Sequence, residues 1–246
     1  SIPWTATAPA PHPMTENEIK LVIGAHADVA ANLLEAGLDG IELQLAHGHL
    51  LQQFLSPVAN ERGDKYGGNL ENRMRIVMET AIAVRQMIGA DRTMGVRISA
   101  DEFLQGGLTL NDMCTVVLKL ASAVQLDFVN VSHSAYHGSY TISTQIADMA
   151  FSNQQFRYLT EAISTNLDGL ERKPVIMSVC RYNSVELAED MLATEKADMI
   201  GMARAHVADP DLVNKAYLGN VEDTIPCIGC NPVSYTHLTL PTNLCV

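Results

Sequence analysis

The N-terminal part of the chain contains one amphipathic helical pattern with a clear start and a clear end. Thr15 and Glu18 have the spacing of a capping box, in which each side chain binds the backbone amide of the other residue. Apolar residues then recur three or four positions apart on one face: Ile19, Val22, Ile23, Val29, Leu33 and Leu34. Gly37 follows the last of them, which is typical of a helix end. The pattern predicts a helix between Thr15 and Gly37.

Short apolar runs alternate with further helical patterns along the rest of the chain. The runs predict strands at 40–45, 93–99, 127–131, 174–178 and 198–202. The helical patterns predict helices at 70–88, 109–123, 153–165, 184–193 and 209–218, with long polar loops before residue 70 and over 132–150. This alternation indicates parallel βα units and an α/β fold. The pattern alone allows either an open doubly wound sheet or part of a closed barrel.

Composition and charge restrict the class of protein. A hydrophobic content of 47% with 5% aromatic residues fits a soluble, well-packed α/β protein. The net charge of −12 argues against nucleic acid or an anionic membrane as a partner. No apolar run is long enough to span a bilayer, and the opening stretch SIPWTATAPAPHP lacks the features of a signal peptide. The cysteines do not form a disulfide framework, so a cytoplasmic location is expected.

Polar side chains gather where the first predicted strand ends, at Gln44, His47 and His49. In parallel α/β proteins, side chains at the carboxyl end of a strand face the ligand crevice. These three can hold a polar ring or polarise a carbonyl group. The alternative is a polar strand end whose groups are satisfied by neighbouring loops.

The following residues carry a family signature. The matching positions are Gln53-Phe54-Leu55-Ser56-Pro57, Asn60, Arg62, Asp64, Tyr66-Gly67-Gly68 and Leu70-Glu71-Asn72-Arg73. At this spacing the segment resembles the flavin oxidoreductases of the Old Yellow Enzyme family, and the resemblance runs from about Met14 to Asn231. It is closest to the branch with dienoyl-CoA reductases, trimethylamine dehydrogenase and N-methyl amino acid demethylases. The resemblance implies a partial TIM (β/α)8 barrel containing strands 4 to 8 only, FMN as cofactor and a small-molecule substrate.

The resemblance also suggests catalytic residues. Family members usually have His, then His or Asn, then often Tyr at the positions of Gln44, His47 and His49, so only His47 matches cleanly. Gln44 can still donate a hydrogen bond from its amide, and His49 can deliver a proton near neutral pH. The departure weakens the case for ordinary enone reduction and leaves room for the amine-oxidising branch.

Arginines at three strand ends match the family's cofactor contacts. Arg97 corresponds to an arginine that lies against the pyrimidine edge of the flavin; the alternative is a salt bridge to Glu102. Arg181 and Arg204 correspond to the phosphate-binding arginines, although Cys180 and Ala203 replace the usual glycines and restrict φ. The alternative is that both are surface arginines at helix starts.

Cys227 and Cys230 form the one close cysteine pair of the chain. By itself a C-x-x-C spacing fits half of a zinc site, a redox pair or the start of an iron–sulfur motif. The resemblance implies that 226–231 begins a 4Fe–4S motif whose third cysteine would fall at position 234, where the chain has Ser234. It also implies downstream domains for FAD and NAD(P)H, and it leaves room for a homo-oligomeric parent protein.

The last residues have an unusual origin. The stretch VSYTHLTLPT back-translates into a transposon sequencing adapter, so 232–246 is expected to be an artefactual tail and 1–231 the natural barrel segment. The alternative is a natural polar tail.

The sequence therefore predicts part of an FMN-dependent oxidoreductase that exchanges hydride with a small organic substrate, by enone or dienoyl reduction or by N-methyl amine oxidation. Two rivals remain: a non-flavin phosphate-binding barrel enzyme, and an inactive truncated fragment. The loop after the third predicted strand adds His133, Tyr136, His137 and Asp148, either to the substrate pocket or to a solvated loop.

Overall fold

The computed structural model describes residues 9, 11–135 and 138–233. Its strands are β1 (Gly40–Leu45), β2 (Thr93–Ser99), β3 (Phe128–Ser132), β4 (Val175–Val179) and β5 (Met199–Gly201). They form one parallel sheet in the order β1-β2-β3-β4-β5, so each strand lies beside the next one in the chain. The predicted α/β class is confirmed, and every predicted strand lies within one residue of its observed bounds.

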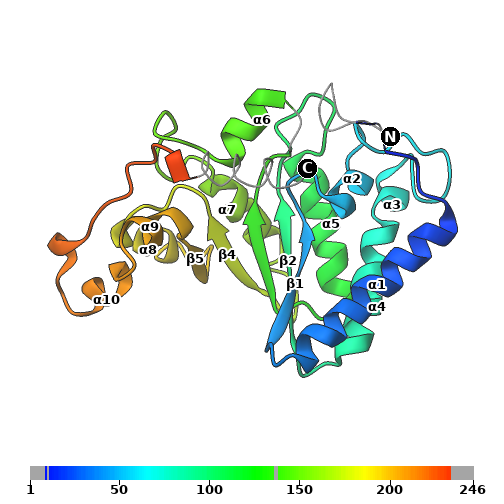
Figure 1. Ribbon diagram of the computed structural model, residues 1–246, viewed down its shortest axis with the longest axis horizontal. Coiled ribbons are helices and arrows are strands. Elements are labelled where there is room, and N and C mark those ends of the chain that lie inside the picture. Colours follow the sequence, from blue (N-terminus) through cyan, green and yellow to red (C-terminus); the bar gives the residue numbers. More distant parts are fainter. Residues whose placement is uncertain (1–8, 10, 136–137, 234–246) are drawn as a thin grey trace.

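Helices connect the strands and cover one side of the sheet (Figure 1). Their bounds are α1 (Glu16–Glu35), α2 (Leu50–Leu55), α3 (Leu70–Arg73), α4 (Arg75–Ile88), α5 (Leu110–Ala123), α6 (Gly138–Gln145), α7 (Arg157–Asn166), α8 (Val185–Leu192), α9 (Ala203–Ala208) and α10 (Leu212–Tyr217), followed by a 3-10 turn at Val221–Asp223. The capping box of Thr15 and Glu18 begins α1, and Thr109 with Asp112 forms a second one at α5. Local sequence therefore fixes where these two helices begin.

Four predicted stretches were wrong in detail. The two predicted loops contain α2 and α6, and α9 precedes the predicted last helix. The helix predicted from 153 begins only at Arg157, because Gln154 has a φ of 57° and breaks the helical path. The three missed helices have only six to eight residues, and such short apolar runs carry little periodic signal.

The two faces of the sheet differ in character. Leu43, Val96, Val129 and Ile176 are in register across four strands, face the helices and are buried. The opposite face carries Gln44, Arg97, Asn130 and Met177 in register. Since side chains alternate along a strand, the apolar core and the polar row are consequences of the same alternation. Arg97 and its neighbours therefore lie on the sheet face that the connecting helices leave uncovered.

The family-signature residues hold a loop together. The buried Asn60 donates from Nδ2 to the carbonyls of Phe54 (2.6 Å) and Tyr66 (2.7 Å). Arg62 binds the Asp64 carboxylate through Nε at 3.0 Å, and Arg73 donates from Nε to the Leu55 carbonyl at 2.7 Å. These contacts satisfy backbone groups that the loop would otherwise leave unpaired. The signature residues named here therefore stabilise the loop conformation and do not line the cavity described below.

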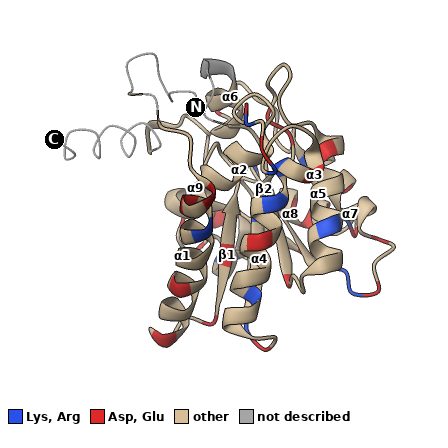
Figure 2. Cartoon of the chain, turned by 90° about the vertical axis from the view of Figure 1, so that its right-hand side faces the viewer, with Lys and Arg blue, Asp and Glu red and all other residues tan. Residues whose placement is uncertain are grey.

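Among the described residues, β1 and β5 are the edge strands of the sheet, and each pairs with one neighbour. Beside β1, a hollow of about 490 Å³ between α1 and the strand is lined mostly by apolar residues, including Val29 and Leu33, which are 54% and 38% exposed. Charged residues lie mainly on helices and loops, with both signs interspersed on the face shown in Figure 2. Within the described residues, no helix is long and apolar enough to cross a membrane.

Candidate functional site

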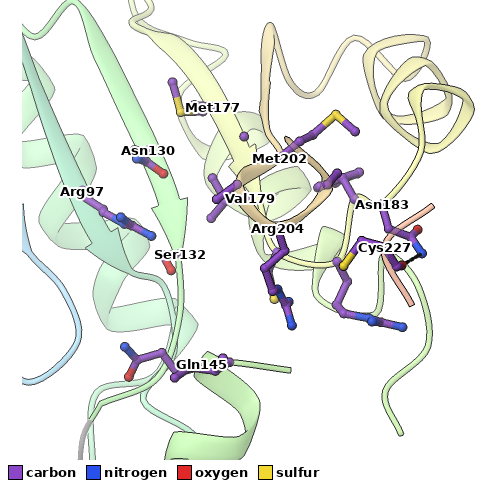
Figure 3. Close-up of a pocket in the computed structure, with 17 residues that line it drawn as sticks. Arg97, Asn130, Ser132, Gln145, Met177, Val179, Asn183, Met202, Arg204 and Cys227 are labelled. Carbon is purple, nitrogen blue, oxygen red and sulfur yellow. Dashed lines mark hydrogen bonds between the residues drawn. The ribbon is translucent and has the colours of Figure 1, made fainter. Parts of the chain in front are cut away.

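A cavity of about 430 Å³ lies at the carboxyl ends of β2 to β5 (Figure 3). Six of the residues singled out from the sequence line it: Arg97, Cys180, Arg181, Ala203, Arg204 and Cys227. Arg97 belongs to β2. Cys180 and Arg181 come directly after β4, Ala203 and Arg204 come after β5, and Cys227 lies in the last described segment. The strand ends thus bring together groups that are up to 130 residues apart in sequence, as expected of a ligand crevice in a parallel sheet (130 = 227 − 97).

Several buried polar atoms around this cavity have no hydrogen-bond partner among the described residues. They are Arg97 Nε, Asn130 Oδ1, Gln145 Oε1, Arg181 Nε and Asn183 Oδ1. Buried polar groups are normally hydrogen-bonded, so a cluster of exceptions indicates a missing polar partner. Donors, acceptors and three cations around one cavity fit an anionic, polar-ringed ligand such as FMN. Sequence reasoning missed Asn130, Gln145 and Asn183, although Asn130 interrupts an otherwise apolar strand in register with Arg97.

Arg97 remains oriented toward this cavity (Figure 3). The alternative partner, Glu102, is 1% exposed and accepts hydrogen bonds from Gln52 Nε2 at 2.9 Å and Ser56 Oγ at 2.8 Å. The Glu102 carboxylate is therefore bound by side chains of α2 and of the residue that follows it. The carboxylate of Glu102 is thus engaged by the loop, and the cofactor role of Arg97 stays a prediction.

The two arginine turns are oriented by neighbouring loops. Arg181 donates from Nη2 to the Phe151 carbonyl at 2.9 Å and to Asn153 Oδ1 at 3.1 Å. Arg204 donates from Nη1 to the Ala147 carbonyl at 2.8 Å. Arg181 is buried and Arg204 is half-buried. Neither is a freely solvated surface arginine, which the alternative interpretation required.

The replaced glycines behave differently from each other. Cys180 has a φ of 81°, in the left-handed region that favours glycine, whereas Ala203 has no positive φ and begins α9. Burial raises the pKa of the Cys180 thiol to about 11, so this group stays protonated at neutral pH. The restriction expected from the sequence therefore applies at Cys180 and not at Ala203.

Cys180 gives a direct test of this backbone strain. The Cys180→Gly variant is expected to be more stable than Cys180→Ala by about 1 kcal/mol, because both lose the thiol but only glycine accepts the left-handed conformation without a steric penalty. Urea unfolding of both variants measures the difference. Equal stabilities, or a more stable alanine variant, would contradict the strain.

His47 lies next to the cavity and is held from two sides. Its backbone amide donates to Ser99 Oγ at 3.0 Å, and its ring Nε2 lies 2.8 Å from Oγ of Ser132, a cavity residue. Burial, followed by the charges of Arg97, His133 and His49, lowers the pKa of His47 to about 3. The ring is therefore neutral at physiological pH and suited to hydrogen bonding rather than to supplying a proton.

The other candidate residues are spread around this site. Gln44 is the in-register neighbour of Arg97, and its Oε1 is a further unpaired buried atom. His49 is exposed at the start of α2 and does not line the cavity. His133 is buried rather than solvated, with its ring stacked on Phe156 at a centroid distance of 4.0 Å. Asp148 is half-buried, while Tyr136 and His137 lie outside the described residues.

The cysteine pair straddles the rim of the cavity. Cys227 lines it, and its carbonyl accepts from Asn183 Nδ2 at 3.1 Å, whereas Cys230 is exposed. Among the residues that the structure describes, no group of three or more metal-ligating side chains is found, and position 234 lies outside them. The cysteine pair itself supplies two thiols, which cannot close a cluster or zinc site alone.

A family model described as the NADH:flavin oxidoreductase / NADH oxidase family matches residues 3–222. The chain belongs to this family. It is 35% identical over 239 residues to a metal reductase of Desulforamulus reducens, covering 96% of this chain and 34% of the relative. It is 36% identical over 216 residues to an N,N-dimethylglycine/sarcosine dehydrogenase of Chromohalobacter salexigens, covering 88% and 30% respectively. The chain thus spans about a third of the length of these NADH:flavin oxidoreductase relatives.

Solved structures agree with the family assignment. A 2-naphthoyl-CoA reductase in complex with 2-naphthoyl-CoA matches with a TM-score of 0.83 and 26% identity, over 92% of this chain and 33% of that one. Morphinone reductase matches with a TM-score of 0.66 and 22% identity, over 87% and 52%, which supports the fold alone. The predicted partial (β/α)8 barrel is therefore confirmed for this NADH:flavin oxidoreductase chain.

Proposed function

We propose that this chain is part of an FMN-dependent oxidoreductase that exchanges hydride between flavin and a small organic substrate. The observation that carries the proposal is the convergence of Arg97, Arg181 and Arg204 on one cavity. Three amide oxygens of its lining, on Asn130, Gln145 and Asn183, have no hydrogen-bond partner among the described residues. Bound FMN would supply the hydride-exchanging ring. Among the lining residues that the structure describes, these three arginines are the ones that carry a full positive charge.

Each residue has a defined part in this proposal. Arg181 and Arg204, with the backbone amides of Cys180 and Ala203, would hold the FMN phosphate at the carboxyl ends of β4 and β5. Arg97 would bring its charge to the flavin ring and stabilise negative charge there. His47, as a neutral ring, orients the substrate by hydrogen bonding, with Gln44 as a second donor and the exposed His49 as the proton source.

The substrate class follows from the departure at Gln44. Gln44 cannot become cationic, so it polarises a carbonyl oxygen less than the usual histidine does. We infer that the protein oxidises a C–H bond beside nitrogen in an N-methyl amine rather than reducing an enone. Two relatives, the dimethylglycine/sarcosine dehydrogenase and a probable N-methylproline demethylase of Rhizobium meliloti, carry names of this class. Turnover of sarcosine against cyclohexenone by the full-length protein separates the two directions.

The finer assignments extend the same proposal. Cys227 and Cys230 provide two ligands of a 4Fe–4S cluster in the parent protein, which contributes the other ligands. NAD(P)H and FAD are the partners of further domains. The reduced cysteines suit a cytoplasmic location. Residues 1–231 form the barrel segment, and 232–246 form the adapter-derived tail.

Replacing Arg204 tests the flavin site. Arg204→Met in the full-length protein is expected to weaken FMN binding by roughly 10- to 100-fold, because a charge-assisted bond to phosphate is worth about 1.5–3 kcal/mol. Quenching of flavin fluorescence on titration measures the affinity. Arg157→Met is the matched control, since Arg157 pairs with Glu161 on α7 and does not line the cavity. A wild-type protein that binds no FMN would instead support a non-flavin barrel enzyme or an inactive fragment.

A further inference from the structure

The segment from Cys227 to Asn231 is fastened to the wall of the cavity at both ends. At its beginning, the Asn183 side chain donates to the Cys227 carbonyl, as Figure 3 shows. At its end, Asn231 is 5% exposed and forms hydrogen bonds in two directions. The residues of this segment are in neither a helix nor a strand, so hydrogen bonds that involve side chains hold the segment in place.

Asn231 joins three parts of the chain. Its Oδ1 accepts from Arg204 Nη1, and its Nδ2 donates to the Ile146 carbonyl at 2.5 Å. The same Arg204 nitrogen donates to the Ala147 carbonyl. One amide and one guanidinium therefore connect the turn after β5, the loop after α6 and the cysteine segment. Asn231 has a φ of 62°, which asparagine tolerates better than most residues.

Gly229 brings the middle of the segment onto the second arginine. It is buried with a φ of 71°, and a Cβ added to it would overlap Nη1 of Arg181. The guanidinium of Arg181 therefore lies directly against the backbone between the two cysteines. Both arginines that face the cavity after β4 and β5 touch this one segment.

The partners of these arginines are neutral. Arg181 binds a carbonyl and the amide of Asn153, and Arg204 binds the Ala147 carbonyl and the amide of Asn231. Neutral acceptors fix the direction of a guanidinium without cancelling its charge. The positive charge stays available to an anion in the cavity. An aspartate at position 231 would keep the shape but remove this property.

We propose that Asn231 is a positioning residue that holds Arg204 for the flavin phosphate and couples the conformation of the Cys227–Cys230 segment to flavin affinity. This inference rests on the proposed flavin function. Because coupling between two sites is reciprocal, flavin binding also tightens the cysteine segment. A change in the conformation of the cysteine segment then alters flavin affinity, and flavin binding alters the accessibility of the cysteine thiols.

Two variants of the full-length protein separate the parts of this inference. Asn231→Gly keeps the left-handed backbone and removes both side-chain bonds, and FMN affinity is expected to fall about 5- to 10-fold. Asn231→Asp keeps the side-chain shape and the contact with Arg204, but it loses the donor to the Ile146 carbonyl and partly neutralises Arg204. FMN affinity is therefore expected to fall by a similar factor. Asn214→Gly, at an exposed asparagine of α10, is the control for a general loss of stability and should leave FMN affinity unchanged.

Thiol labelling tests the coupling independently of activity. After removal of bound metal ions, FMN is expected to slow iodoacetamide labelling of Cys227 in the wild type several-fold, and to have no such effect in Asn231→Gly. Peptide mapping by mass spectrometry measures both rates. If the wild type binds FMN, and both position-231 variants keep the wild-type FMN affinity and the slower labelling of Cys227 in the presence of FMN, this inference alone is overturned. Wild-type protein that binds no FMN would overturn the proposed function with it. If the glycine variant does not fold, the aspartate variant carries the same two measurements.

Discussion

The free energy of unfolding is expected to fall as the pH drops from 7 to 5, because two histidines are buried as neutral rings. Burial is the first cause of the lowered pKa in both, to about 3 for His47 and about 4 for His133. The charge of Arg97 lowers both values further, and the Thr144 carbonyl, which accepts from His133, opposes the shift at that residue. Protonation therefore favours the unfolded chain.

The direction of this effect follows from proton uptake. An unfolded histidine binds a proton below about pH 6.5, whereas these folded rings remain neutral until pH 3 to 4. Stability is thus fully present above about pH 6.5 and declines as the pH falls through the window between the unfolded and folded pKa values. Each ring contributes up to about 1.4 kcal/mol per pH unit, so roughly 2–4 kcal/mol is lost between pH 7 and pH 5.

Urea unfolding at half-unit steps between pH 5 and 7.5 measures this slope. His47→Asn should reduce the slope by about half, since asparagine tolerates the φ of 60° at this position and does not titrate. His206→Asn, at an exposed residue of α9, is the matched control and should keep the wild-type slope. A stability that stays constant over this range would contradict the buried neutral state of both rings.

Glu102→Leu is expected to lower the free energy of unfolding by roughly 3–5 kcal/mol. The Glu102 carboxylate is 1% exposed and accepts from Gln52 Nε2, Ser56 Oγ and the backbone amide of Leu108, the last at 2.7 Å. Leucine fills similar space but leaves these three donors buried without an acceptor. Each lost partner costs about 1–3 kcal/mol, and part of this is recovered where water enters.

Chemical denaturation at pH 7 measures the change. Glu189→Leu, at an exposed position of α8, is the matched control and should stay within about 0.5 kcal/mol of the wild type. Glu102→Gln should fall between the two, because it retains one acceptor oxygen. A loss below about 1 kcal/mol for Glu102→Leu would mean that the loop finds other partners for its donors.

The regular elements were predictable because their signals are local. Capping boxes at Thr15 and Thr109 and the apolar strand runs can be recognised within a few residues, and the structure agrees with them. The short helices α2, α6 and α9 could not be predicted, since packing rather than periodicity stabilises a helix of six to eight residues. The left-handed conformation of Cys180 was indicated only through the glycine that the family has there.

The candidate site was predictable in its charged residues but not in its neutral ones. Arg97, Arg181 and Arg204 lie near the carboxyl ends of predicted strands. Burying an unpaired charge in an apolar core is unfavourable, so an arginine at such a position indicates a ligand site. Asn130, Gln145 and Asn183 gave no comparable signal, because an amide side chain fits a loop or a strand end equally well. The burial of His47, which keeps its ring neutral, could not be read from the sequence, whereas its place at a strand end could.

The sequence by itself determined the α/β class, the order of the five strands and the family to which the chain belongs, because alternation, capping and motif spacing are properties of neighbouring residues. Only the tertiary structure decided which polar groups meet. In the structure, strand register puts Asn130 beside Arg97, and the Glu102 carboxylate accepts a hydrogen bond from Ser56. Asn231 contacts Arg204, which is 27 residues away in the sequence. Such meetings depend on long-range packing, which fixes the burial and charge of each group and is not encoded in any short stretch of sequence.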